Sequence, residues 1–361
     1  MTVAASLCCL PVWAANTHEK RTNKPARAKA IAKADASADA SADVVTYGRR
    51  DDVMRFAADL AESRSIDRAW LESALAQARY QPSVARLIMP PAVGTAKNWA
   101  AYRARFVEPR RIQAGLAFWA RHQAWLDAAE QRHGVPAEIV LGIIGVETFY
   151  GQVMGDYRVL DALATLAFDF PSGRKDRSAF FRQELGHFLT WTEREGLPPT
   201  RTKGSYAGAI GLGQFMPSSI HTYAVDFDAD GHIDMSTSVA DVIGSVANYL
   251  AAFGWVRGQP THFAVQPPLD TSDRAALLLP DILPTFTAEQ MAARGALLGD
   301  EGRAHVGPLA LVELQNGAAA ASYVAGTQNF YVVTRYNWSS YYALAVIELA
   351  QALKAQRERS R

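Results

Sequence analysis

Residues 140–151 read VLGIIGVETFYG, and this stretch says most about the fold. Glu147 is the only charged residue between Glu138 and Asp156. The residues around it are apolar on nearly every side of a helix, and a helix that is apolar all round is buried. The sequence therefore predicts a helix from Ala137 to about Tyr150 that is covered by the rest of the protein.

The helical neighbours of Glu147, three and four residues away, are Ile143, Ile144, Tyr150 and Gly151. Apolar surroundings disfavour the charged carboxylate and raise its pKa. A glycosidase needs a carboxyl that keeps its proton near neutral pH, so that it can protonate the leaving oxygen. A structural glutamate paired with an arginine is the alternative that this motif leaves open when taken alone.

The remainder of the chain adds more helices and one β-rich part. Apolar residues recur at helical spacing over 52–77 and 111–132, and a closing helix is predicted over about 341–354. Prolines and short apolar runs over 260–333 favour a small β-rich subdomain. The predicted fold class is α+β, mainly α, because helical segments dominate.

The composition excludes some functional classes. The chain has 361 residues, of which 49% are hydrophobic and 20% charged, so it can bury a sizeable core. The formal net charge of +1 argues against a nucleic-acid-binding protein, which would carry a basic excess. After the N-terminus no apolar run reaches about 18 residues, so no membrane-spanning helix is expected there.

The N-terminus resembles an export signal. A short apolar run ends in Val12-Trp13-Ala14, which fits cleavage after Ala14, although no basic residues precede the run. We expect residues 1–14 to be a signal peptide and the mature protein to be periplasmic; a buried N-terminal element is the alternative. Cys8 and Cys9 both lie in this segment. A lipid anchor to the outer membrane is not favoured, because neither cysteine follows the Gly or Ala that such signals usually have.

The chain divides into two further parts after that signal. Residues 15–50 are rich in Ala, Lys, Ser and Asp, with the near-repeat ADASADASAD, and predict a disordered linker. Residues 51–361 form the expected catalytic region. It includes an acidic loop over 226–241 and a β-rich insertion over about 258–333.

A glycine-rich segment, SYAGAIGLGQFMPSS, spans residues 205–219. Gly208, Gly211 and Gly213 allow tight turns and a close approach of the backbone, and Gln214 adds an uncharged donor and acceptor. No Lys-Ser/Thr pair follows the glycines, so the segment is not a phosphate-binding loop. A neutral polar groove of this kind suits sugar amides and hydroxyls.

An acidic segment, DFDADGHID, begins at residue 226 and follows the spacing of a calcium-binding loop. The predicted ligands are the side chains of Asp226, Asp228 and Asp230 at positions 1, 3 and 5 and the carbonyl of His232 at position 7. Position 12 is Thr237 and not the usual Glu, so Asp241 is expected to close the site. The alternative is a solvated turn capped by aspartates.

Together these motifs resemble the lytic murein transglycosylase B family, glycoside hydrolase family 103. The resemblance runs from about residue 51 to 354 and rests on five landmarks in order: GIIGVETFYG, SYAGAIGLGQFMPSS, VDFDADGHID, IGSVANYL and VTRYNWSSYYALAV. It implies a lysozyme-like core, with a helical domain and a small β-rich subdomain around a groove that binds peptidoglycan glycan strands.

The resemblance also implies a mechanism and a set of site residues. Glu147 would be the single acid/base, assisted by the acetamido group of the substrate, and the product would end in a 1,6-anhydro ring. The substrate-binding residues that it implies are Tyr102, Arg177, Ser205, Gln214, Tyr249, Asn337 and Tyr342. Three features depart from the family: an inserted PSGRKD before Arg177, one extra residue before Asp241, and Trp338 where a polar residue is usual.

Two other functions stay open at this point. A true muramidase would need a second carboxylate across the cleft, for which Asp156, Asp161 and Asp169 are the candidates. A cell-wall-binding protein without turnover would not depend on Glu147. A calcium sensor is disfavoured by the single loop without its Glu. We expect a monomer that uses structural Ca²⁺ and no organic cofactor, with cell-wall synthesis proteins as further partners.

Overall fold

The computed structural model describes residues 45–48, 50–90 and 97–360. The expected signal peptide and almost all of the expected linker lie outside these residues. The described chain joins the fold slightly before residue 51, because Val45 and Tyr47 bind the segment 78–80. The amide of Tyr47 donates to the carbonyl of Ala78 at 2.9 Å, and the amide of Tyr80 donates to that of Val45 at 2.9 Å.

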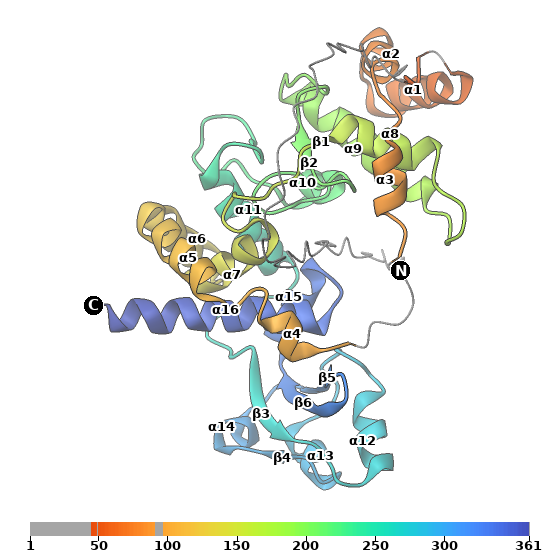
Figure 1. Cartoon of the computed structure of the whole chain (residues 1–361). Coiled ribbons are helices and arrows are strands. Elements are labelled where there is room, and N and C mark those ends of the chain that lie inside the picture. The colour runs from red at the N-terminus through yellow and green to blue at the C-terminus, as the bar shows by residue number, and fades with distance from the viewer. Residues whose placement is uncertain (1–44, 49, 91–96, 361) are drawn as a thin grey trace, which may run out of the picture.

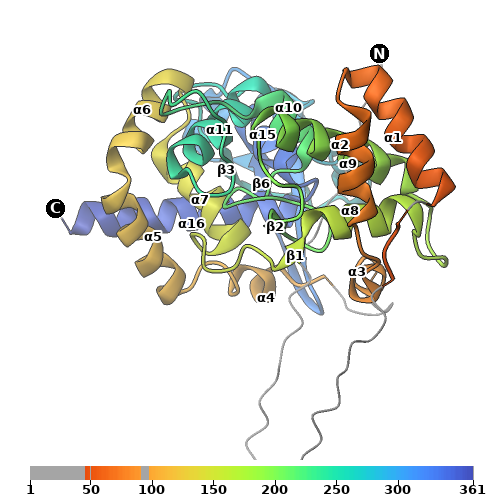
Figure 2. The same ribbon diagram turned by 90° about the horizontal axis from the view of Figure 1, so that it is seen from above.

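Helices dominate the described chain, and Figures 1 and 2 show their arrangement. The first nine are α1 (Asp51–Arg64), α2 (Arg68–Ala76), α3 (Pro82–Leu87), α4 (Trp99–Arg103), α5 (Pro109–Arg121), α6 (Gln123–His133), α7 (Ala137–Thr148), α8 (Val159–Phe168) and α9 (Ser178–Arg194). The others are α10 (Pro217–Tyr223), α11 (Val239–Ala252), α12 (Thr271–Leu278), α13 (Ala288–Ala293), α14 (Asp300–Ala304), α15 (Gln328–Tyr336) and α16 (Ser340–Arg359).

Two of the stretches with helical spacing each contain a break. The stretch 52–77 holds both α1 and α2, which Ser65 separates with a left-handed φ of 56° before Asp67 caps the second helix. The stretch 111–132 holds α5 and α6, which meet at His122. Apolar residues keep their helical spacing across each break, because both helices of a pair bury an apolar face. The spacing alone therefore does not reveal the turn.

The helix α7 is buried almost throughout, as its apolar sequence predicts. It packs along α16, and glycine makes the close approach possible. A Cβ on Gly142 would lie 2.6 Å from the carbonyl oxygen of Val346. Figure 2 shows α1, α2 and α3 with α8 and α9 at one end of this core, and α5 and α6 at the other.

The β structure forms two sheets. Strands β1 (Tyr157–Arg158) and β2 (Lys203–Gly204) make a short antiparallel pair beside the segment that follows α7. The second sheet has four antiparallel strands in the order β4-β3-β6-β5. These strands are β3 (His262–Gln266), β4 (Leu297–Leu298), β5 (Ala310–Asn316) and β6 (Ala319–Gly326).

The four-stranded sheet lies in the range where the sequence predicts a β-rich part. It has a small core of its own, which includes Phe263, Leu277, Met291 and Leu311. Figure 1 shows it with α12, α13 and α14 at one end of the molecule, beyond α16 and α4. Among the helices of the described ranges, none combines the length and the apolar character needed to cross a bilayer.

Candidate active site

Glu147 lies in the last turn of α7, with its side chain half-buried. The hydroxyl of Tyr342, from α16, donates a hydrogen bond of 2.6 Å to its Oε1. Burial raises the pKa of Glu147 from 4.5 to about 7, although the Tyr342 hydrogen bond acts in the opposite direction. The carboxyl can therefore hold or release a proton near neutral pH, as an acid/base catalyst must.

The backbone turns sharply directly after Glu147. Phe149, Tyr150 and Gly151 have left-handed φ angles of 52°, 56° and 86°. For the two aromatic residues this conformation is costly and persists only where the surroundings enforce it. Thr148, which is buried, supplies part of that enforcement: its hydroxyl donates to the carbonyl of Leu212 at 2.9 Å and accepts from the amide of Gly151 at 3.1 Å.

An arginine does not neutralise Glu147 among the described residues. Arg111 is the basic side chain at this helix end, and its guanidinium donates to the carbonyl of Gly145. It also lies 4.5 Å from the ring centroid of Phe149. The pKa of Glu147 is shifted by burial and by Tyr342, with no basic group among the causes. The alternative of a structural Glu–Arg pair therefore has no support in this geometry.

The glycine-rich segment packs against the turn after α7. Gln214 has a left-handed φ of 50°, and its side-chain amide donates to the carbonyls of Gly211 at 2.9 Å and Met154 at 3.2 Å. The hydroxyl of Ser205 accepts from the amide of Ala209 at 3.0 Å. Both predicted sugar contacts thus also shape this loop, and Gln214 joins it to the backbone that follows Glu147.

A group of tyrosines lies at the Glu147 carboxyl and behind it. Tyr336 stacks on Tyr342, with ring centroids 6.4 Å apart and planes at 9°, and its hydroxyl donates to the carbonyl of Gly213 at 2.5 Å. Tyr249 lies 4.9 Å from Tyr336 and is only 5% exposed. Tyr336 is not among the predicted site residues, although it stands directly before Asn337 in the landmark VTRYNWSSYYALAV.

The other predicted substrate contacts have different positions. Asn337 is 6% exposed, and its side-chain carbonyl has no hydrogen-bond partner within the described part of the chain. Tyr102 packs beside Tyr341, with centroids 6.0 Å apart, and lies close enough to Tyr342 to raise its pKa. Arg177 is at the start of α9, where its guanidinium lies 4.4 Å from the ring centroid of Phe180.

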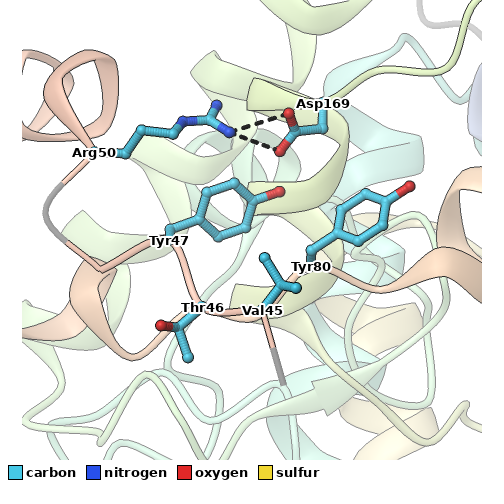
Figure 3. A pocket seen from close by; sticks show the side chains of 6 residues that line it. All are labelled: Val45, Thr46, Tyr47, Arg50, Tyr80 and Asp169. Carbon is cyan, nitrogen blue, oxygen red and sulfur yellow. Dashed lines mark hydrogen bonds and ion pairs between the residues drawn. The ribbon is translucent and has the colours of Figure 1, made fainter. Parts of the chain in front are cut away.

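The three candidate second carboxylates are all engaged away from Glu147. Asp156 is exposed and lies 3.6 Å from the ammonium of Lys203. Asp161 is buried and accepts from the amide of Arg79 at 3.0 Å. Asp169 accepts two hydrogen bonds from the guanidinium of Arg50. Both residues line a pocket of about 330 Å³, as do Tyr47 and Tyr80 (Figure 3). None of them is among the groups that shift the pKa of Glu147.

The acidic loop brings three predicted metal ligands together. Oxygens of Asp226, Asp228 and Asp230 lie within 4.8 Å of one another. Asp226 also accepts from the amides of Asp230 and Gly231 at 3.1 and 2.9 Å, which curls the loop around its first carboxylate. Hard oxygen donors converging in this way fit Ca²⁺.

Asp241 and His232 are placed differently from those three aspartates. Asp241 is buried, and its two oxygens accept from the amides of Phe227 and Asp234, each at 2.8 Å. It therefore ties both halves of the loop to α11 and is not part of the three-aspartate cluster. The imidazole Nδ1 of His232 lies 3.3 Å from the carboxylate of Glu195. The side chain is thus engaged outside the cluster, and the predicted metal ligand of this residue is its backbone carbonyl. Asp234, at position 9, was not singled out from the sequence.

The chain is similar to known proteins over most of its length. Residues 48–351 match the sequence profile of the family "Transglycosylase SLT domain". Membrane-bound lytic murein transglycosylase B of Escherichia coli K12 is 39% identical over 323 residues, which cover 86% of this chain and 85% of that protein.

Solved structures give the same result. Soluble lytic transglycosylase SltB1 of Pseudomonas aeruginosa has a TM-score of 0.76 at 38% identity, covering 85% of this chain and 99% of that one. The calcium complex of Escherichia coli Slt35 has a TM-score of 0.74 at 38% identity, covering 86% and 95%. SltB3 of Pseudomonas aeruginosa, in complex with NAG-anhNAM-pentapeptide, has a TM-score of 0.71 at 30% identity, covering 83% and 79%.

These likenesses confirm the expected lysozyme-like, mainly helical fold and the family resemblance. The matches extend over most of the chain, including Glu147 and the residues around it. The chain therefore belongs to the transglycosylase SLT family and is a lytic murein transglycosylase, an enzyme that cleaves peptidoglycan.

Proposed function

We propose that the enzyme cleaves the β-1,4 bond between N-acetylmuramic acid and N-acetylglucosamine without water, with Glu147 as its single acid/base. Glu147 donates its proton to the glycosidic oxygen as the bond to the muramic C1 breaks. The acetamido oxygen of the same sugar shields the positive charge that develops at C1. The Glu147 carboxylate then takes the proton of the 6-hydroxyl, whose oxygen bonds to C1 and closes the 1,6-anhydro ring.

The observation that carries this proposal is the environment of Glu147. With a pKa of about 7, the carboxyl has both protonation states available near neutral pH, so one residue can act first as acid and then as base. Tyr342 occupies Oε1. We therefore assign the transferred proton to Oε2.

The engaged positions of Asp156, Asp161 and Asp169 count against the muramidase alternative. A conventional glycosidase needs a second carboxylate as nucleophile or to activate water, whereas assistance by the substrate acetamide removes that need. The SltB3 complex with an anhydro-muramyl ligand supports the same product chemistry in a relative.

The proposal extends to the substrate contacts. We assign glycan binding to Tyr102, Ser205, Gln214, Tyr249, Asn337 and Tyr342, and we assign Arg177, at the start of α9, to a peptide or lactyl carboxylate. The side-chain carbonyl of Asn337 is buried without a partner among the described residues, so a sugar N–H or O–H would gain that hydrogen bond only if a neighbouring side chain moved aside. Tyr249 and Tyr342 are nearly inaccessible, so they would act chiefly by holding the wall and the carboxyl.

Calcium has a structural role in this proposal. Asp226, Asp228 and Asp230 would hold the ion with the carbonyl of His232, and the calcium complex of Slt35 supports the choice of metal. Bound Ca²⁺ would neutralise the repulsion of three neighbouring carboxylates. Asp241 would keep the loop on α11 as a direct ligand or through its two backbone hydrogen bonds.

We further propose that the enzyme works in the periplasm, where peptidoglycan lies, after export by the N-terminal segment. The Escherichia coli relative is named as a membrane-bound enzyme. A monomeric state and contacts with cell-wall synthesis proteins stay predictions from the sequence.

Mass spectrometry of muropeptides released from purified sacculi tests the reaction. The wild-type protein should release anhydro-terminated products, and Glu147→Gln should release none. Products that carry an added water would make the enzyme a muramidase. No release by the wild-type protein would favour a binding protein.

A further inference from the structure

A continuous row of aromatic rings connects Glu147 to the surface. Tyr342 binds Glu147 and stacks on Tyr336, which lies 4.9 Å from Tyr249. Tyr249 in turn lies 4.7 Å from Phe253, measured between ring centroids. Each step is a direct ring contact, so side chains packed against one another link the far end of the row to the Glu147 carboxyl.

The row continues through a cation to an exposed tryptophan. The guanidinium carbon of Arg335 lies 5.0 Å from the ring centroid of Phe253 and 5.0 Å from that of Trp338. Trp338 is 40% exposed and occupies the turn between α15 and α16, next to Asn337. An exposed indole presents a flat apolar face, which suits the C–H face of a pyranose.

Aromatic rings surround the guanidinium of Arg335, and its N–H donors stay available within the described residues. It also lies 5.8 Å from the ring centroid of Tyr331, so three aromatic side chains surround it. Within the described chain its guanidinium forms no ion pair or hydrogen bond with a carboxylate. Arginine stays charged at all relevant pH values and presents a planar set of N–H donors that matches a carboxylate. A cation on a tryptophan face with free donors is therefore suited to an acidic ligand.

We propose that Trp338 and Arg335 form an outer subsite for a muramic residue, in which the indole stacks on the sugar and the guanidinium binds a carboxylate that this sugar carries. The inference rests on the proposed function, since it takes the substrate to be a glycan strand that extends from Glu147 to Trp338. The carboxylate has two sources: the free lactyl acid of a strand without peptides, or a carboxylate of the peptide stem.

The test measures strand binding in the Glu147→Gln background, so that turnover does not interfere. Titration calorimetry gives the Kd for three ligands: peptide-free strands, the same strands with their lactyl acids amidated, and stem-bearing strands. Trp338→Ala should raise the Kd about tenfold on all three ligands, which corresponds to the loss of one good contact. Trp338→Phe, which keeps a ring, should stay within about threefold of the parent.

Trp125→Ala is the matched control, because Trp125 is 38% exposed but lies on α6. It should leave the Kd unchanged and shows what the loss of a surface tryptophan does by itself. Thermal unfolding of each variant identifies any that fails to fold. If Trp338→Ala fails to fold, Trp338→Phe tests position 338 in its place. If Arg335→Gln fails to fold, Arg335→Lys tests position 335.

Arg335→Gln distinguishes the two carboxylate sources. A Kd raised about tenfold on peptide-free strands but not on amidated ones assigns the lactyl acid, and a rise confined to stem-bearing strands assigns the stem. The proposal is overturned if Trp338→Ala binds all three ligands like its parent, or if Arg335→Gln loses as much affinity for amidated strands as for charged ones. Hydrolytic products from the intact enzyme would overturn the proposed function but would leave this comparison of Kd values intact.

Discussion

Replacing Glu147 by glutamine should stabilise the protein in alkaline solution while abolishing catalysis. Burial raises the pKa of Glu147 from 4.5 to about 7, so the folded state disfavours the ionised carboxyl. A group whose pKa is raised on folding contributes its full stability below its unfolded pKa and loses it as the pH rises through the folded value. The wild-type protein should therefore lose stability through this group between about pH 4.5 and 7.

The magnitude follows from the size of the pKa change. A rise from 4.5 to about 7 corresponds to about 3 kcal/mol of unfolding free energy at roughly 1.4 kcal/mol for each pH unit. Glutamine has nearly the same shape, and its side-chain oxygen can still accept the hydrogen bond of Tyr342. The variant should thus match the wild type within about 1 kcal/mol at pH 4 and exceed it by about 2 to 3 kcal/mol at pH 8.

Urea unfolding of both proteins at pH 4 and pH 8 measures this difference, and other titrating groups cancel in the comparison. Glu62→Gln is the control, because Glu62 is an exposed glutamate on α1. It should change the unfolding free energy by less than about 0.5 kcal/mol at either pH. If Glu147→Gln is no more stable than the wild type at pH 8, then burial does not hold this carboxyl in its protonated form, and the acid role loses its physical basis.

Three more predictions concern the surroundings of this carboxyl and the acidic loop. Tyr342→Phe removes the donor that lowers the pKa of Glu147, so the alkaline limb of the kcat/KM profile should move up by about one pH unit; a limb that stays or moves down contradicts this. Gly211→Ala would place a Cβ 1.7 Å from the carbonyl oxygen of Met235 at a φ of 71°, so urea unfolding should show a loss above ~2 kcal/mol, and a loss below ~1 kcal/mol would refute the close approach. Added Ca²⁺ should raise the melting temperature of the wild type but not of Asp226→Asn; equal responses, or no effect of a chelator on the calcium-loaded wild type, would remove the metal site.

The central helix was predictable because one physical signal determines it. A run of apolar residues with a single carboxyl is buried whatever surrounds it, and burial alone implies the raised pKa of Glu147. The aspartate spacing of the acidic loop is similarly local, since positions 1, 3 and 5 of one turn converge without help from elsewhere. Local patterns of this kind carry their structural consequence within a few residues.

The partners of Glu147 were not predictable from spacing, because they come from distant parts of the chain. The motif predicts that Tyr342 contacts sugar, and it gives no sign that the hydroxyl donates to the Glu147 carboxyl. Asp241 was expected to bind the metal, and both its oxygens accept backbone amides of the loop. In each case the residue type fits both roles, and only the three-dimensional position of the neighbouring donors and acceptors distinguishes them.

The surroundings of Glu147 also explain why rigidity has to accompany the raised pKa. A buried carboxyl whose ionised form is disfavoured would turn toward water if the backbone allowed it. Thr148 ties the end of α7 to Leu212, and the left-handed Phe149 and Tyr150 hold the chain in a conformation that it would otherwise leave. Tyr342 then fixes one carboxyl oxygen by a bond that itself lowers the pKa. In the proposed mechanism the site thus gives up part of its pKa elevation to keep the second oxygen in a fixed direction, because proton transfer to a glycosidic oxygen depends on position first and on pKa second.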